Sequence, residues 1–191
     1  MTGIYIFLAD GFEDIEALAC YDILRRGGTG VRLVSLNDDL QVLSAHGLTV
    51  NADITLDMLP HTDDGTTAGD FMIFPGGMPG AARLAACSPL MEKMKAHYAA
   101  GGSIAAICAA PGLVLPELGD VCNGLKFTCY DGFEQEMEAL GAVHLKQAVV
   151  RDRRIITGRG PGYALDFSYE ILAAARGEAF REDVRKAMFL G

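Results

Sequence analysis

The sequence lacks the features of several large protein classes. It has only 16 Lys and Arg against 25 Asp and Glu, a formal net charge of −9, whereas a broad nucleic-acid surface needs clustered basic residues. No apolar run approaches the roughly 18 residues that span a bilayer. Residues 1–8 lack the basic region and the cleavage site of a signal peptide. We therefore expect a cytoplasmic protein with no membrane partner and no specific nucleic-acid partner.

Cysteine and histidine are not spaced as in common frameworks. The five cysteines are an odd number at irregular spacings, which does not fit a disulfide scaffold. No Cys-x-x-Cys pair occurs, so a zinc ribbon or a thioredoxin-like redox pair is not expected. Cys122, Cys129 and His144 match no strong metal pattern, and His97 is most simply a packing or surface residue in a helix. We expect neither a metal nor a cofactor.

Apolar residues, in contrast, are abundant. Half of the residues are hydrophobic and 21% are charged, so a large core can form. The length of 191 residues fits one domain, 1–191, and no repeat, linker or low-complexity segment interrupts it. Continuous apolar runs at 4–8, 31–36, 71–74 and 103–107 are typical of strands covered on both faces.

A β–α–β unit opens the chain. Between 4–8 and 31–36, apolar residues recur at helical spacing, acidic residues crowd the start, and Gly27-Gly28 stop the helix. Such a unit implies a parallel sheet with a right-handed crossover, and we predict an α/β fold with a doubly wound, mostly parallel sheet. The remaining pattern predicts short strands at 41–44, 48–54, 127–130, 148–151 and 155–157, a helical turn at 56–59, a polar loop at 61–69, an irregular stretch at 119–126, and helices near 88–100, 109–118, 133–140, 164–172 and 184–190.

Cys108 lies at a predicted strand-to-helix elbow. A buried strand precedes it, and Pro111 is tolerated in the first turn of the helix that follows. Unpaired backbone N–H groups at a helix start favour a thiolate and would hold a nearby oxyanion. The same pattern also fits a cysteine that merely fills the core, so a reactive Cys108 is a hypothesis at this point.

Two other segments are expected to meet Cys108. In doubly wound folds the working site lies beyond the carboxyl ends of the strands, which is where Glu16 and the Gly76-Gly77 pair fall. A protonated Glu16 would donate a hydrogen bond to the sulfur, and burial is the physical route to such a raised carboxyl pKa; alternatively it is simply a helix-start acid. Gly76-Gly77 lacks the partners of a phosphate loop and suits a close backbone approach to the sulfur.

Four blocks of sequence together resemble the ThiJ/PfpI superfamily, in its DJ-one-like branch. The blocks are Leu-Ala-Asp-Gly-Phe-Glu-Asp-Ile-Glu at 8–16, Phe-Pro-Gly-Gly at 74–77, Ala-Ala-Ile-Cys-Ala-Ala-Pro at 105–111 and Thr-Gly-Arg-Gly-Pro-Gly at 157–162. They cover nearly the whole chain in the family's order. The resemblance implies a flavodoxin-like three-layer sandwich, similar to class I glutamine amidotransferases, and a homodimer.

The resemblance also implies roles for single residues. Cys108 matches the family's nucleophilic, oxidation-sensitive cysteine, and Glu16 matches its protonated glutamate partner. Gly77, next to Gly76, and Ala109 match the positions whose N–H groups form the oxyanion site. Tyr130 stands where a characterised member has a histidine, and a tyrosine is a poor base near neutral pH.

The activity implied by the resemblance is a cofactor-independent reaction on small α-oxoaldehydes or their adducts, of glyoxalase or deglycase type. Two alternatives remain open: a redox-sensing or chaperone protein that acts through oxidation of Cys108, and a thiamine-pathway or ligand-binding protein with an inert cysteine. Protease-like relatives have a histidine where this chain has Ala109, so a peptidase is disfavoured. A glutamine amidotransferase is disfavoured because no downstream His-x-Glu pair is recognisable.

Overall fold

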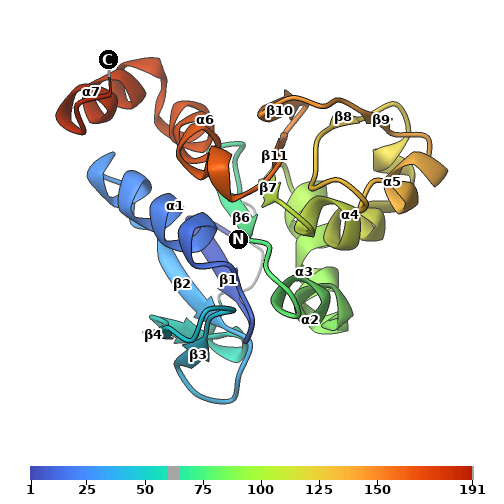
Figure 1. Ribbon diagram of the computed structural model, residues 1–191, viewed down its shortest axis with the longest axis horizontal. Coiled ribbons are helices and arrows are strands. Elements are labelled where there is room, and N and C mark those ends of the chain that lie inside the picture. The colour runs from blue at the N-terminus through green and yellow to red at the C-terminus, as the bar shows by residue number, and fades with distance from the viewer. Residues whose placement is uncertain (60–64, 191) are drawn as a thin grey trace.

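The computed structural model describes residues 1–59 and 65–190 and is built around one seven-stranded sheet (Figure 1). The strand order is β10-β11-β7-β6-β1-β2-β5, and every neighbouring pair is parallel except β10 with β11. The strands are β1 (Ile4–Leu8), β2 (Arg32–Ser35), β5 (Ile54–Thr55), β6 (Phe71–Phe74), β7 (Ser103–Ile107), β10 (Val149–Asp152) and β11 (Ile155–Gly158).

Helices cover both faces of the sheet (Figure 1), which is why its central strands are continuous apolar runs. Alternate residues of β1 enter different cores: Ile6 packs into one, and Phe7 packs into the other. The first core is covered by α1 (Asp14–Arg26), α6 (Ala164–Arg176) and α7 (Glu178–Ala187), and the second by α2 (Gly80–Ala86), α3 (Ser88–Ala99), α4 (Ala110–Val114) and α5 (Gln135–Ala139).

Two small sheets and three short 3₁₀ helices complete the described part of the chain. Strands β3 (Gln41–Leu43) and β4 (Thr49–Asn51) form an antiparallel hairpin, and β8 (Lys126–Phe127) pairs in parallel with β9 (Val143–His144). The 3₁₀ helices are η1 (Leu56–Met58), η2 (Leu115–Cys122) and η3 (Pro161–Tyr163). Within the described ranges, no helix has the length and apolar character needed to cross a membrane.

The four long strands, the β–α–β unit and the 149–158 hairpin confirm the sequence prediction. The strand predicted at 48–54 is instead divided in two. After β4, the N–H of Asp53 donates to Leu33 O (2.9 Å) and its carboxylate accepts from Leu33 N–H (2.7 Å). These contacts turn the chain away from the hairpin, so that β5 joins the edge of the main sheet beside β2.

Other differences are local. Helix α2 and strand β9 were not predicted, and the irregular stretch expected at 119–126 begins inside η2. The strand predicted at 127–130 is limited to Lys126–Phe127, and the last helix begins earlier than expected, at Glu178, and ends at Ala187. The first part of the polar loop predicted at 61–69 lies outside the described residues.

His97 is a packing residue and is fully buried. Its Nε2 lies 3.1 Å from both Asp70 O and Ser103 O, while its Nδ1 has no hydrogen-bond partner among the described residues. Burial lowers the pKa of the imidazole, against the opposing effect of the two carbonyls. A Cβ at Gly102 would lie 2.2 Å from the ring, so this glycine makes room for a neutral histidine.

We expect His97 to make the fold less stable in mild acid. Because its pKa is lowered in the folded chain, the unfolded chain binds the proton first as the pH falls below about 6.5. The stabilising effect is complete above that pH and declines below it, by at most about 1.4 kcal/mol per pH unit. Urea unfolding at pH 7 and pH 5.5 should show a smaller acid loss for His97→Gln than for wild type; equal losses would contradict this account.

Candidate active site

Cys108 lies between the end of β7 and the start of α4, as predicted, and its backbone is held in an unusual conformation. Its φ is +64°, a region that L-residues avoid unless the surroundings impose it. The N–H of Cys108 donates to Gly158 O (2.9 Å), and its carbonyl accepts from Tyr130 N–H (2.8 Å). Strand β11 and the segment after β8 therefore fix the elbow from both sides, leaving the side chain half-buried.

Glu16 lies in the first turn of α1 and is 1% exposed. Its Oε2 accepts a hydrogen bond from Gly76 N–H (2.7 Å). Its Oε1 is buried without a hydrogen-bond partner of ordinary geometry in the described part of the chain, and the thiol of Cys108 interacts with this same carboxyl. The structure thus brings Glu16 and Cys108 together, although 92 positions separate them in the sequence.

The two glycines of the loop after β6 allow this close approach. A Cβ at Gly76 would lie 2.6 Å from Cys108 Cβ, 3.0 Å from its Sγ and 2.8 Å from Glu16 Oε2. Gly77 has a φ of +85°, and a Cβ there would lie 2.4 Å from Glu13 N. A side chain at Gly76 would displace the pair itself, and one at Gly77 would displace the backbone just before α1.

Two backbone donors affect the Cys108 thiol. The N–H groups of Ala109 and Gly77 both lower the pKa of this thiol, and their role as a pair of oxyanion donors stays a prediction. Ala109 itself is buried at the start of α4. Such fixed N–H groups stabilise negative charge that develops in front of them.

The electrostatics of the pair differ from the sequence prediction in one respect. Burial raises the pKa of Glu16 to about 7, with hydrogen bonds from Gly76 and Cys108 opposing the shift and the charge of Glu13 adding to it. Burial also raises the pKa of Cys108 to about 12, and the negative charge of Glu16 raises it further, against the N–H groups of Ala109 and Gly77. The donors at the helix start lower the thiol pKa, as the sequence predicts, but burial outweighs them in the resting site.

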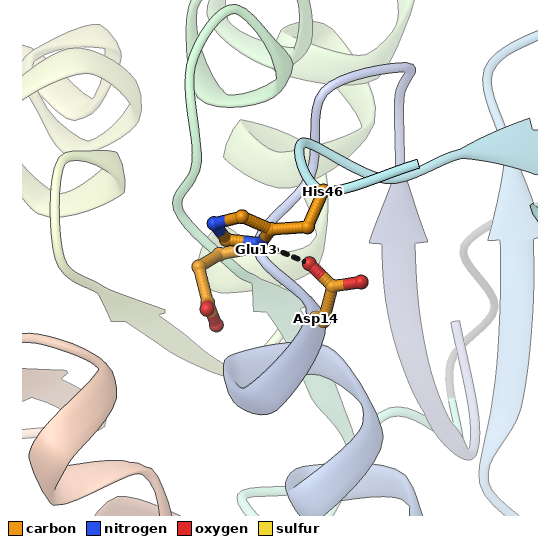
Figure 2. Close-up of side chains that lie close together, drawn as sticks. All are labelled: Glu13, Asp14 and His46. Atoms are coloured by element: carbon orange, nitrogen blue, oxygen red, sulfur yellow. Dashed lines mark hydrogen bonds and ion pairs between the residues drawn. The ribbon is translucent and has the colours of Figure 1, made fainter. Parts of the chain in front are cut away.

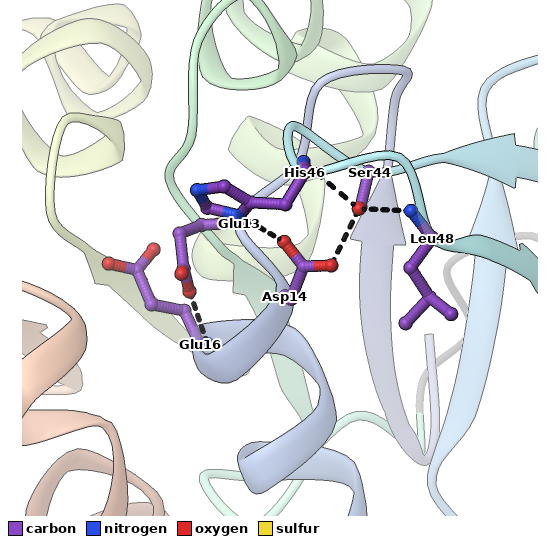
Figure 3. A network of polar contacts seen from close by, with 6 residues as sticks. All are labelled: Glu13, Asp14, Glu16, Ser44, His46 and Leu48. Carbon is purple, nitrogen blue, oxygen red and sulfur yellow. Dashed lines mark hydrogen bonds and ion pairs between the residues drawn. The ribbon is translucent and has the colours of Figure 1, made fainter.

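A network of polar contacts holds the N-terminal turn of α1, which carries Glu16 (Figure 3). Glu13 caps the helix by accepting the N–H of Glu16 (2.8 Å). Asp14 accepts from Ser44 Oγ (2.6 Å) and lies 2.6 Å from Nδ1 of His46. Burial alone would raise the pKa of Asp14, but these hydrogen bonds hold it below its usual value, and the same contact raises the pKa of His46. The β3–β4 hairpin is thereby fastened to the turn that positions the catalytic candidate Glu16.

Glu13, Asp14 and His46 also have their ligand atoms within 4.8 Å of one another (Figure 2). Carboxylate and imidazole groups are metal ligands in other proteins. Here, however, Glu13 already accepts a backbone N–H, and Asp14 already accepts from Ser44 and pairs with His46. The group also lies at the positive end of a helix. These contacts explain why the three side chains lie together: they join the β3–β4 hairpin to the start of α1.

Tyr130 reaches Cys108 through its backbone, while its side chain is 51% exposed. Its ring lines a groove of about 340 Å³, which we call the tyrosine groove. The groove is lined by Tyr130, Asp131, Arg159, Gly160, Pro161, Gly162 and Tyr163. The sequence analysis identified the Gly-Arg-Gly-Pro-Gly block but not Tyr163, which follows it. The position of Tyr163 directly after this block was the feature that could have pointed to it.

Cys122, Cys129 and His144, which the sequence analysis considered as a metal site, do not form one cluster of three. Cys129 Sγ lies 4.0 Å from His144 Nε2, whereas the thiol of Cys122 donates to Leu115 O (3.2 Å). The side chain of His144 also packs against Phe127, with ring centroids 5.2 Å apart. Two of the three candidates are therefore neighbours, and the third has a separate partner.

The close approach at Gly76 leads to a direct test. Gly76→Ala should lower the free energy of unfolding by about 1–3 kcal/mol, the usual effect of overpacking, and should change the iodoacetamide reactivity of Cys108. Gly30→Ala is the matched control, because a Cβ at Gly30 meets nothing within 4 Å, and it should stay within about 0.5 kcal/mol of wild type. Equal effects of the two changes in urea unfolding would contradict the described packing.

The chain is similar to known proteins over nearly its whole length. The Caenorhabditis elegans protein named glutathione-independent glyoxalase DJR-1.2 is 32% identical over 178 residues, covering 93% of this chain and 90% of the relative. The crystal structure of Drosophila melanogaster DJ-1beta has a TM-score of 0.88 at 28% identity and covers both chains fully. Oxidised Toxoplasma gondii DJ-1 has a TM-score of 0.87 at 29% identity, covering 99% of this chain and 98% of that one.

Two plant relatives are longer. Arabidopsis thaliana protein DJ-1 homolog A is 33% identical over 187 residues, which are 98% of this chain but 46% of the relative. For homolog B the chain spans 38% of the relative, so it covers less than half of either plant protein. The family model described as DJ-1/PfpI family matches residues 2–174. With the sandwich fold and the Glu16–Cys108 site in place, this match shows that the chain belongs to the DJ-1/PfpI family.

Proposed function

We propose that this protein converts small α-oxoaldehydes, or their adducts, into hydroxy acids without a cofactor, as a glyoxalase- or deglycase-type enzyme. The observation that carries the proposal is the buried pair of Glu16 and Cys108, in which a carboxyl with a pKa of about 7 faces a thiol. A group that titrates near neutral pH can both accept and return a proton under working conditions. The naming of one relative as a glutathione-independent glyoxalase supports the same reaction class.

The first step forms a covalent bond to the sulfur. Ionised Glu16 accepts the thiol proton as Cys108 Sγ attacks the aldehyde carbon, and the C=O π electrons move to oxygen. The N–H groups of Gly77 and Ala109, which lower the pKa of the Cys108 thiol, would stabilise this oxyanion. Glu16 then returns the proton to the oxygen, which gives a neutral hemithioacetal and leaves the carboxylate free.

The second step moves hydrogen between two carbons of the substrate. Carboxylate Glu16 removes the proton from the carbon bonded to sulfur, which gives an enediolate, and delivers that proton to the neighbouring carbon, while the hydroxyl proton of the hemithioacetal passes to the neighbouring oxygen. The product is a thioester of the hydroxy acid, with one carbon oxidised and the other reduced, so no external oxidant is needed. Hydrolysis by water releases the hydroxy acid and restores the thiol of Cys108.

The alternative function, redox sensing or chaperone behaviour through oxidation of Cys108, uses the same residues. One observation favours it: a related structure, Toxoplasma gondii DJ-1, is described as oxidised. A sulfinate on Cys108 would meet the same N–H groups and the same carboxyl. However, the naming of a relative as a glutathione-independent glyoxalase and a carboxyl able to move a proton near neutral pH favour the enzymatic function.

Lactate formation from methylglyoxal, with no glutathione added, tests the proposal. Cys108→Ala should abolish turnover, and Glu16→Gln should lower kcat by about 10²–10⁴-fold, the usual contribution of a positioned acid or base. Cys87→Ala is the matched control, because Cys87 is also a half-buried free cysteine, and it should retain wild-type turnover.

Circular dichroism would verify that each of these variants is folded. If folded wild type makes no lactate while dilute peroxide oxidises Cys108 selectively, the enzymatic proposal is wrong and the redox function takes its place.

A further inference from the structure

The tyrosine groove has two aromatic walls that the reaction steps do not use. Tyr130 and Tyr163 are 51% and 39% exposed, although both line the same groove of about 340 Å³. Aromatic side chains that remain exposed in a concave site are well suited to pack against a flat ligand. The volume is at the lower end of the range typical of small-molecule sites.

Both walls are joined to the backbone that holds the nucleophile. The N–H of Tyr130 donates to Cys108 O, and the N–H of Cys108 donates to Gly158 O, two residues before Gly160 of the groove. The other wall is anchored to the same segment, since Tyr163 N–H donates to Gly160 O (2.9 Å). The groove therefore adjoins the backbone of the elbow that carries Cys108.

The charges in the groove favour a neutral ligand. Arg159 Nη2 lies 3.0 Å and 3.1 Å from the two carboxylate oxygens of Asp131. Asp131 balances the charge of this guanidinium, so the lining of the groove has no net charge to attract an anion, and an uncharged ring leaves the ion pair in place. Gly160 also lies against the Tyr130 ring, since a Cβ there would be 3.4 Å from ring carbon Cδ2.

We propose that the tyrosine groove is an aryl subsite that binds the aromatic substituent of an aryl α-oxoaldehyde, such as phenylglyoxal, and gives such substrates an advantage over methylglyoxal. This inference rests on the proposed function and names the substrate class within it. Tyr163 is the specificity-determining residue, since it lines the groove and its N–H donates to Gly160 O rather than to Cys108. The covalent steps are unchanged, with the aryl group replacing the methyl group.

The kinetic test compares kcat/KM for phenylglyoxal with kcat/KM for methylglyoxal. Tyr163→Leu should lower this ratio by about three- to tenfold, the effect of losing one aromatic contact. Tyr163→Phe keeps the ring and should keep the wild-type ratio. Phe180→Leu on α7 removes an aromatic ring of similar exposure, 41%, and should leave the ratio unchanged. An unaltered ratio in folded Tyr163→Leu overturns the inference.

A binding measurement separates this inference from the proposed function. The probes are 2-hydroxyacetophenone and hydroxyacetone, neutral hydroxyketones that carry the same aryl or methyl group but no aldehyde, measured by saturation-transfer NMR. The aryl probe should bind at least threefold more tightly to wild type, and Tyr163→Leu should remove that preference. If neither aldehyde is turned over but this pattern holds, the proposed function fails and the subsite stands. If both are turned over and wild type shows no aryl preference in binding, the subsite is wrong and the function stands.

Discussion

A carboxyl group buried against a thiol is the constraint on which the rest of this site depends. Glu16 has one good hydrogen-bond donor, Gly76 N–H, and its other oxygen is buried without a hydrogen-bond partner among the described residues. Removing a carboxylate from water is costly unless its charge is compensated, so the carboxyl retains its proton up to about pH 7. The chemistry that we propose is a direct consequence of this desolvation.

The surrounding structure holds Glu16 and Cys108 together although the backbone of Cys108 is strained. The left-handed conformation of Cys108 persists because β11 and the Tyr130 segment hold its N–H and its carbonyl. Gly76 lets the loop after β6 lie close to both the Glu16 carboxyl and Cys108. On the far side, Glu13 caps α1 and Asp14 binds the β3–β4 hairpin, so Glu16 starts from a fixed helical turn. Three segments distant in the sequence are thus required for one interaction.

Much of this assembly could be predicted from the sequence, for a physical reason. Parallel strands share one carboxyl edge, so the segments after β1, β6 and β7 had to meet, and with them Glu16, Gly77 and Cys108. The pKa of Cys108 could not be predicted in the same way, because desolvation depends on how the two sheet faces and the loops enclose the sulfur. The hairpin contact between His46 and Asp14 was missed because it joins residues with no local pattern in common.

The central claim is that Glu16, rather than Cys108, titrates near neutral pH in the resting protein. The most direct measurement is a pH titration that follows the Glu16 side-chain carboxyl by ¹³C NMR and thiolate formation by ultraviolet absorbance. The account predicts that the carboxyl titrates near pH 7, in line with its raised pKa, and that no Cys108 thiolate appears below about pH 9, as expected for a thiol whose pKa lies above its usual value of about 8.5. A carboxyl that titrates at its ordinary pKa, or a Cys108 thiolate already present at pH 7, would contradict it.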